Sequence, residues 1–226
     1  MSSAELYINL TNICSNWSAL NSLSNGSAGA VVKANAYGLG IKEVGISLAK
    51  AGARDFFVAI VEEGAELRRA IGQGPKIYVF SGHMVGDTSL IKNFDLIPLI
   101  NSAEQLAFHA ENSADQSIGI QLDTGMNRLG MEGAEFLAIK DIIFKFNPEL
   151  IISHLACADD PSHPMNEKQL NYFNAITENI DCKKSLAATG GILLGKRYHF
   201  DMTRPGIGLY GGNPYSGSKN VVGLKL

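Results

Sequence analysis

The strongest constraint on the fold is a repeating pattern along the chain. From Ala30 onward, short and nearly continuous apolar runs alternate with stretches whose apolar residues recur at helical spacing. The apolar runs begin near residues 30, 55, 76, 95, 117, 150, 185 and 199, and all but one are followed by a helix or a helix-like stretch. Strands that are apolar along their whole length are typical of a parallel sheet covered on both faces.

Eight strand–helix units within roughly 200 residues predict an α/β fold of the TIM type, a (β/α)8 barrel with parallel strands. A doubly wound sheet is the alternative, and the regular spacing of the units favours the barrel. Before the first unit we expect a short strand over residues 6–10 and a helix to about Leu23, capped by Thr11 or Asn12. Residues 1–215 are expected to form the barrel, and residues 216–226 a linker and the first strand of a C-terminal β domain that is missing from the chain.

Composition excludes several classes of function. Lys and Arg number 19 against 22 Asp and Glu, and no cluster of basic residues offers a surface for nucleic acid. The N-terminus lacks a basic and apolar leader, and no run approaches the roughly 18 apolar residues of a membrane span. We therefore expect a cytoplasmic protein with no membrane partner. The three cysteines form no C-x-x-C pair, which argues against disulfides and a cysteine-rich zinc site.

Polar residues of mechanistic type follow five of the predicted strands. Lysine is rarely buried without a reason, because removing an ammonium group from water costs free energy or lowers its pKa. A lysine at the end of a buried strand is therefore either extended to solvent or available for Schiff-base chemistry. In a barrel, these strand ends meet at one mouth. The residues are Lys33 with Tyr37, then Asp123, Thr124 and Arg128, and then His154, Thr189 and Arg204.

Glycines follow the last two predicted strands. The loops after strands seven and eight of such barrels commonly hold a phosphate through backbone N–H groups. Two segments fall there, Thr189-Gly190-Gly191 and Gly206-Ile207-Gly208. A lysine after strand one combined with this phosphate site predicts that the barrel binds pyridoxal 5′-phosphate.

Four segments resemble the N-terminal barrel of the alanine racemase family. They read VVKANAYG, LDTGMNRLG, SHLA and DMTRPGIGLYGG, and the resemblance extends from about Leu6 to Pro214. It implies a pyridoxal-phosphate-dependent isomerase that interconverts L- and D-alanine, with D-alanine as a peptidoglycan precursor. It also implies a homodimer.

The resemblance implies a role for each matching residue. Lys33 would form the internal aldimine with the cofactor and act as the base on one face of the substrate. Tyr37 would support the phosphate, and Arg128 would bind the phenolic oxygen of the cofactor and the carboxylate of the substrate.

The remaining roles concern the cofactor ring and its phosphate. His154 would stack on or beside the ring and orient Arg204, which would pair with the pyridine nitrogen and keep it unprotonated. Thr189, Gly206 and Ile207 would hold the phosphate. Because an arginine cannot accept a proton, the ring would be a weaker electron sink, which favours racemisation over transamination.

Several positions depart from the pattern of the family. Gln121 stands where some members have a carbamylated lysine, and we expect it to hydrogen-bond Arg128. Leu39 replaces a histidine, and Ala188-Thr189 replaces an Asn-Ser pair. The family also carries a C-terminal β domain whose tyrosine is the base on the opposite face. Because the chain ends before it, we expect cofactor binding without efficient racemisation, unless a partner chain supplies that domain.

Alternative functions follow from the same residues. A non-catalytic or weakly active barrel, either a pseudoenzyme or a pyridoxal phosphate homeostasis protein, would also bind the cofactor, although the lysine and RPGIG motifs argue against a homeostasis protein. His154, His163 and the aspartates between them could bind a metal, but a solvated loop is favoured, so no metal site is expected. The segment GIGLYG is not followed by a helix, which argues against a dinucleotide site.

Two groups of charged residues are expected to be structural. Asp123 should order its own loop through nearby backbone N–H groups. The charges of residues 62–69, which are Glu62, Glu63, Glu66, Arg68 and Arg69, predict a solvated helix face.

Overall fold

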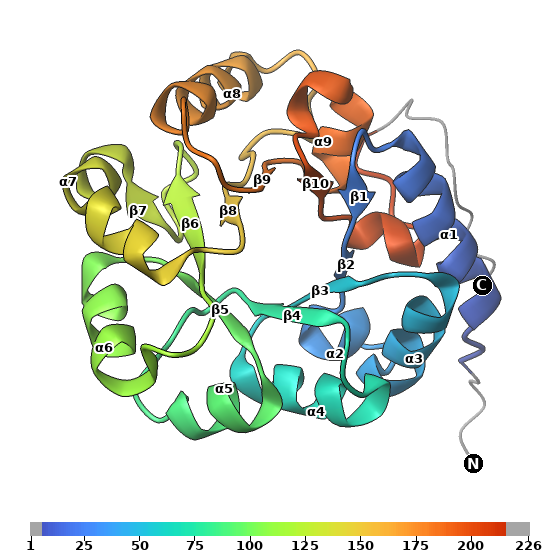
Figure 1. Ribbon diagram of the computed structural model, residues 1–226. Helices are drawn as coiled ribbons and strands as arrows, with labels where there is room; N and C mark the ends of the chain where they lie inside the picture. Colours follow the sequence, from blue (N-terminus) through green and yellow to red (C-terminus); the bar gives the residue numbers. More distant parts are fainter. Residues whose placement is uncertain (1–5, 216–226) are drawn as a thin grey trace.

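The computed structural model describes residues 6–215, and the segment 216–226, predicted to be a linker and a strand, lies outside the described residues. Strands form a ring and helices surround it (Figure 1). The strands are β1 Ser27–Ala28, β2 Ala30–Val31, β3 Asp55–Val58, β4 Lys76–Val79, β5 Ile97–Ile100, β6 Gly119–Asp123, β7 Met131–Glu132, β8 Ile151–Ile152, β9 Lys184–Ser185 and β10 Met202–Thr203.

Most helices connect one strand to the next on the outside of the ring. They are α1 Leu10–Leu23, α2 Lys33–Tyr37, α3 Ile41–Ala51, α4 Val61–Ile71, α5 Thr88–Phe94, α6 Ala103–Ser113, α7 Gly133–Ile143, α8 Pro164–Ile176 and α9 Thr189–Leu194, with short 3-10 turns η1 Phe144–Phe146, η2 Lys196–Tyr198 and η3 Ile207–Tyr210.

The strand pairings are parallel and close into a barrel. Strands β2, β3, β4, β5, β6, β8 and β9 lie in that order, and β1 pairs with β10. Gly29 joins β1 to β2, and its N–H donates to the carbonyl of Thr203 at 2.9 Å. On the other side, the Arg204 N–H donates to the carbonyl of Ala187 at 2.8 Å. These two bonds complete the ring, so the predicted TIM-type barrel is confirmed.

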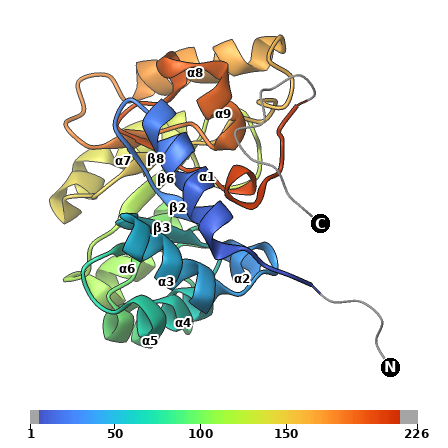
Figure 2. The ribbon, with the colours of Figure 1, turned by 90° about the vertical axis from the view of Figure 1, so that its right-hand side faces the viewer.

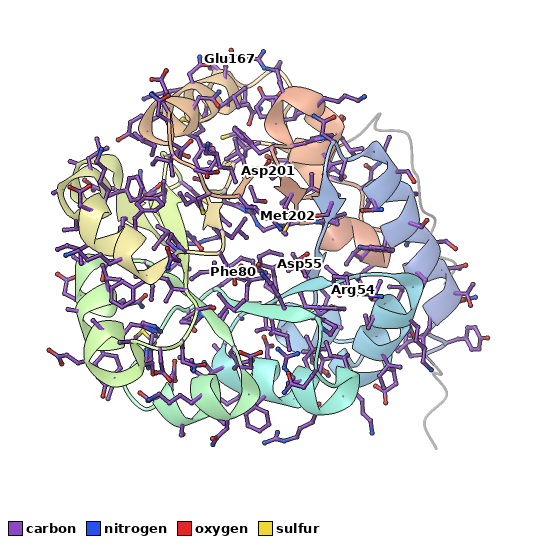
Figure 3. The ribbon with its side chains drawn as sticks, in the orientation of Figure 1. Arg54, Asp55, Phe80, Glu167, Asp201 and Met202 are labelled. Atoms are coloured by element: carbon purple, nitrogen blue, oxygen red, sulfur yellow. The ribbon has the colours of Figure 1, made fainter. Side chains whose placement is uncertain are left out.

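Two apolar cores result from this closure. The larger one lies between the strands and the surrounding helices. The smaller one fills the barrel interior with Val31, Phe57, Tyr78, Ile97, Leu99, Leu150, Ile152 and Met202. Figure 3 shows Asp55, Phe80 and Met202 within the ring, whereas Glu167 lies on the outer helical layer. Because both faces of each strand are packed, the strands are apolar along their length.

Helix α1 occupies the place that an eighth outer helix would take. It packs between α3 and α9 (Figures 1 and 2). The helix begins at Leu10, and its N-cap is Asn9, whose Oδ1 accepts the N–H of Asn12 at 3.1 Å. The predicted strand over residues 6–10 and the predicted caps are therefore wrong. Tyr7 is 85% exposed, so this segment has no sheet against which to form a strand.

Arg68 corrects the prediction of a fully solvated face on α4. Its side chain is 5% exposed, and it donates hydrogen bonds to backbone carbonyls around the C-terminal ends of α4 and α5. The carbonyl oxygens belong to Gly72, Pro75, Phe94 and Asp95. An arginine has five donors and can satisfy several such acceptors at once. Arg68 therefore joins two helices instead of facing water.

Among residues 6–215, no helix is both long and apolar enough to cross a membrane.

Candidate functional site

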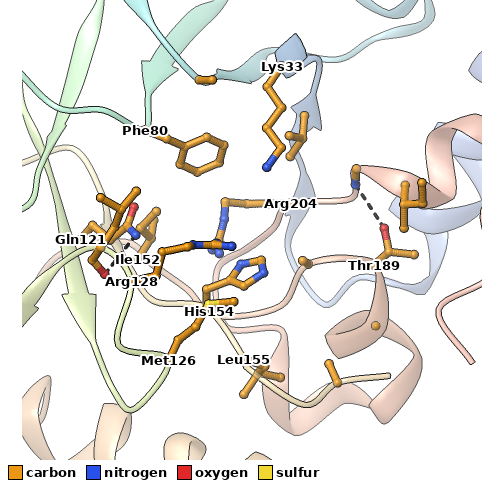
Figure 4. A pocket seen from close by; sticks show the side chains of 18 of the residues that line it. Lys33, Phe80, Gln121, Met126, Arg128, Ile152, His154, Leu155, Thr189 and Arg204 are labelled. Carbon is orange, nitrogen blue, oxygen red and sulfur yellow. Dashed lines mark hydrogen bonds between the residues drawn. The ribbon is translucent and has the colours of Figure 1, made fainter. Parts of the chain in front are cut away.

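A cavity of about 930 Å3 opens at the carboxyl ends of the strands. The eight residues predicted to bind the cofactor or the substrate all line it, and Figure 4 shows several of their side chains facing one another. They are Lys33, Tyr37, Arg128, His154, Thr189, Arg204, Gly206 and Ile207. Asp123 and Thr124, which were also expected at the mouth, do not line the cavity. The topology thus brings together residues that lie up to 174 positions apart, from Lys33 to Ile207 (207 − 33 = 174). Their individual roles stay predictions at this point.

Lys33 lies between β2 and an unusual left-handed turn. The four residues that follow it, Ala34 to Tyr37, all have φ between 51° and 56°. Burial and the charge of Arg128 lower the pKa of Lys33, and the charge of Glu63 opposes that change. The Lys33 Nζ lies 5.8 Å from the centre of the Phe80 ring. A lowered pKa increases the share of neutral amine, which is the nucleophilic form.

Tyr37 and the loops after β9 and β10 form one end of the cavity. The Thr189 Oγ1 accepts the N–H groups of Gly206 and Gly208, each at 3.1 Å. A Cβ atom at Gly206 would lie 2.6 Å from the Tyr37 hydroxyl, so a larger residue there would displace the Tyr37 side chain. The Tyr37 ring packs against Tyr210 with centroids 4.7 Å apart. These contacts fix a small polar recess made of hydroxyl and backbone groups.

Arg204 is a buried cation held by oxygen atoms of two neighbouring strands. It is 2% exposed, and its guanidinium donates to the Ser185 Oγ at 2.5 Å and to the Ser153 carbonyl at 2.6 Å. Burial lowers the pKa of Arg204 to about 9, so it stays charged at neutral pH. These serine oxygens orient the guanidinium in the structure, and an orienting role for His154 stays a prediction.

His154 lines the cavity as a neutral imidazole. Burial, together with the charges of Arg204 and Arg128, lowers the pKa of His154 to about 3. Its backbone is held by Gln169 of α8, a fully buried side chain whose Nε2 donates to the His154 carbonyl at 2.8 Å. The Gln169 Oε1 accepts the N–H of Ala156 at 2.8 Å.

Gln169 was missed by the sequence reasoning, although a signal for it exists. With Asn166, it occurs at helical spacing with Leu170 and Phe173 on the buried face of α8. An amide among apolar residues on a buried helix face needs hydrogen-bond partners. The spacing therefore could have identified Gln169 as a buried polar contact to the strand ends.

Arg128 projects from the exposed loop after β6. As predicted, Asp123 orders this loop, because its Oδ1 accepts the N–H groups of Gly125, Met126 and Asn127 at 2.8 to 3.1 Å. Asp123 is thus committed to backbone hydrogen bonds.

Gln121 and Arg128, which both lie in the described part of the chain, do not form the expected hydrogen bond. The Gln121 Nε2 instead donates to the Leu129 carbonyl at 3.3 Å, and its buried Oε1 has no hydrogen-bond partner. Gln121 sits within β6, whereas Arg128 is exposed on the following loop. Gln121 therefore hydrogen-bonds the backbone next to Arg128 and not the Arg128 guanidinium.

The charge on the cavity wall is mainly positive. The charged lining residues are Lys33, Arg128, Arg204 and one acidic residue, Asp159. This set suits a ligand with several negative groups. Among residues 6–215, no three His, Cys, Asp or Glu side chains are grouped as a metal site. His163, considered as a ligand, accepts the N–H of Met165 and caps α8.

Known proteins that resemble this chain are alanine racemases. The family model for the N-terminal domain of alanine racemase matches residues 8–214. An alanine racemase of Cereibacter sphaeroides is 56% identical over the whole chain, which spans 65% of that protein's length. An alanine racemase of Rhizobium meliloti is 48% identical over 96% of the chain and 59% of its own length.

Solved structures agree with these relatives. The crystal structure of alanine racemase from Bartonella henselae with covalently bound pyridoxal phosphate has a TM-score of 0.88 and 34% identity, and covers 95% of this chain and 65% of that one. The alanine racemase of Acinetobacter baumannii has a TM-score of 0.87 and 27% identity, and covers 98% of this chain and 63% of that one. The chain described here belongs to the alanine racemase family and corresponds to its N-terminal domain.

Proposed function

We propose that this chain is the pyridoxal-phosphate-binding barrel of an alanine racemase, an isomerase that interconverts L- and D-alanine. The observation that carries the proposal is the single cavity in which Lys33 faces Arg204 and His154, with Thr189 and Gly206 at its other end. The relative from Bartonella henselae, with its covalently bound cofactor, supports the same assignment.

The residues fit the cofactor in charge and in shape. Lys33 has a lowered pKa and offers an amine for covalent attachment. In the recess of Thr189, Gly206 and Tyr37, the glycine lets the Tyr37 hydroxyl approach the backbone, and the polar groups there suit a phosphate. The positive charge of Arg204 supplies a hydrogen-bond donor for a ring nitrogen.

The chain's own groups have distinct tasks in this reaction. Bound pyridoxal phosphate supplies an electron sink for the carbon from which a proton is removed. The Lys33 Nζ would hold that proton on its side of the substrate, and Arg128 would bind the substrate carboxylate. Arg204 has hydrogen-bond donors and no acceptor atom. It would therefore donate a hydrogen bond to the ring nitrogen, and that nitrogen would stay unprotonated. The neutral His154 would pack beside the ring.

The first experiment identifies the lysine. The chain is incubated with pyridoxal phosphate, the adduct is fixed with borohydride, and the modified peptide is located by mass spectrometry. We expect the label on Lys33, its loss in Lys33→Ala, and its retention in Lys42→Ala, which alters an exposed lysine of α3. Labelling of another lysine in the unmodified chain would overturn the proposal.

The second experiment addresses the activity. Circular dichroism of L-alanine incubated with the loaded chain measures racemisation directly. Loss of signal with time supports a racemase, and a constant signal with labelled Lys33 supports a barrel that binds the cofactor without turnover. The homodimer and the cytoplasmic location stay predictions.

A further inference from the structure

The left-handed turn after Lys33 needs an external restraint. Left-handed backbone costs roughly 1–2 kcal/mol for each residue other than glycine, and here four such residues, Ala34 to Tyr37, are consecutive. The turn makes internal hydrogen bonds, including the N–H of Gly38 to the carbonyl of Ala34 at 2.9 Å. The Asn35 Oδ1 also accepts the N–H of Ile41 at 2.8 Å. These local bonds belong to the turn itself and do not attach it to the barrel.

Apart from the packing of Tyr37 on Tyr210, Glu63 of α4 attaches the turn to the barrel by hydrogen bonds. Its Oε1 accepts the N–H of Asn35 at 3.2 Å, and its Oε2 accepts the N–H of Ala59 at 2.8 Å. Ala59 directly follows β3, the strand that pairs with β2. One carboxylate therefore bridges the loops that follow two neighbouring strands. Among the described residues, Glu63 is the only side chain of another element that hydrogen-bonds the backbone of residues 34–37.

We propose that Glu63 is a positioning residue, which holds the left-handed turn against β3 so that Lys33 and Tyr37 face the cavity. This inference rests on the proposed function of Lys33 as the lysine that binds the cofactor. It assigns to Glu63 a restraint on the backbone and no contact with the substrate.

The charge of Glu63 agrees with this position. The carboxylate opposes the lowering of the Lys33 pKa caused by burial and by Arg128, so it lies within electrostatic reach of the lysine. A charged acceptor also makes stronger hydrogen bonds to N–H groups than a neutral one does. The adjacent Glu62 is exposed on the same turn of α4 and provides a matched control.

The first test measures the turn without the cofactor. Amide hydrogen exchange is compared in the 226-residue chain, in Glu63→Ala and in Glu62→Ala. Loss of a charged hydrogen bond of about 1.4 kcal/mol corresponds to a tenfold change. We therefore expect about tenfold faster exchange at Asn35 and Ala59 in Glu63→Ala, and no change in Glu62→Ala. Unchanged exchange in Glu63→Ala would overturn the proposal.

The second test measures cofactor retention by borohydride fixation at Lys33. We expect Glu63→Ala to need about tenfold more pyridoxal phosphate for half-labelling, and Glu63→Gln to lie between it and the unmodified chain, because an amide keeps one acceptor. Should Glu63→Ala fail to fold, the exchange and retention of Glu63→Gln decide the matter, and values equal to those of the unmodified chain would contradict the proposal.

A second substitution distinguishes restraint of the turn from a general effect of charge. Glycine adopts the left-handed conformation without steric cost, so Ala34→Gly should restore at least half of the retention lost in Glu63→Ala. No restoration would contradict the positioning role. If the unmodified chain is not labelled at all, the proposed function fails, while the exchange experiment still tests Glu63.

Discussion

The two ends of the barrel treat their charged residues in opposite ways. At the mouth, Lys33, Arg128 and Arg204 line one cavity, and none of them takes part in an ion pair within the described residues. At the opposite end, which we call the floor, Lys76 forms an ion pair with Glu149. Lys76 is the first residue of β4, and Glu149 lies two positions before β8.

The floor is also closed by packing. The Tyr78 hydroxyl donates to the Asp55 carboxylate at 3.4 Å, and Phe57 stacks on Tyr78 with centroids 4.8 Å apart. Charges that lack a partner reduce stability, and they persist where a ligand supplies the opposite charge. The difference indicates that the floor stabilises the barrel and that the mouth is prepared for an anionic ligand.

An aromatic column allows the largest test of this contrast. Phe57 lies between Tyr78 on the floor side and Phe80, which lines the cavity. The ring centroids of Phe57 and Phe80 are 5.6 Å apart. Because Phe57 is fully buried, Phe57→Ala should lower the free energy of unfolding by about 3–5 kcal/mol. Phe80→Ala should cost less stability and mainly weaken cofactor retention. Urea unfolding and fixation at Lys33 measure the two effects.

Equal losses of stability in the two variants would contradict this contrast, because they would show that a ring at the mouth contributes to folding as much as a ring in the barrel interior does. A matched control is Phe94→Ala, which removes a half-buried ring on the outer layer. It should leave cofactor retention unchanged.

Arg204 gives the second test, with an intermediate effect. A buried charge without an ionic partner carries a desolvation cost, and an apolar residue of similar length removes that cost. We therefore expect Arg204→Met to change the free energy of unfolding of the cofactor-free chain by less than about 1 kcal/mol, and to weaken cofactor binding by about 1–3 kcal/mol. Thermal unfolding and equilibrium labelling provide the measurements.

A strong destabilisation of Arg204→Met would contradict this view, since it would make the guanidinium part of the structural core. Its hydrogen bonds to Ser185 and Ser153 are the contacts through which such a role would act. The variant Ser185→Ala removes one of these hydrogen bonds and keeps the charge of Arg204. It therefore distinguishes a structural role of the guanidinium from a role in binding the cofactor.

The sequence predicted the barrel and the composition of the cavity because both depend on local patterns. Apolar strands at regular spacing indicate parallel strands, and parallel strands place their ends at one mouth. Lys33 and Arg204 could be assigned to the same cavity by this argument alone, before any distance between them was known.

The supporting residues could not be predicted in the same way. Glu63 and Arg68 occur in a charged helical segment, and only the packing of α4 against its neighbours shows that both bind backbone groups. The left-handed turn of Ala34 to Tyr37 contradicts the local preference of its residues and is maintained by tertiary contacts. The hydrogen bond of Gln121 to Leu129 likewise depends on how one loop returns to its strand.

A pair of histidines supports the mouth from the side. The His83 Nδ1 lies 3.0 Å from the His109 Nδ1, and the His109 Nε2 lies 3.3 Å from the Gln116 carbonyl. Because that carbonyl only accepts, the His109 Nε2 donates to it and its Nδ1 accepts from His83. The His83 Nε2 then accepts from the Thr88 hydroxyl at 2.9 Å. All three hydrogen bonds are made when both rings are neutral.

Acid should therefore loosen this side of the mouth. Burial lowers the pKa of His83 to about 4, with the charges of His109 and Lys92 in the same direction. The unfolded chain takes up a proton near pH 6.5 and the folded chain only near pH 4, so stability falls as the pH decreases between these values. Each histidine with a lowered pKa contributes a slope of at most about 1.4 kcal/mol for each pH unit, and His109 and His154 add to the slope from His83. Thermal unfolding from pH 7.5 to 5 should show this decrease in the unmodified chain and in His163→Gln, which alters an exposed histidine, and a smaller decrease in His83→Gln. The same slope in His83→Gln would show that other groups cause it, and the mouth would then be no more sensitive to acid than the floor.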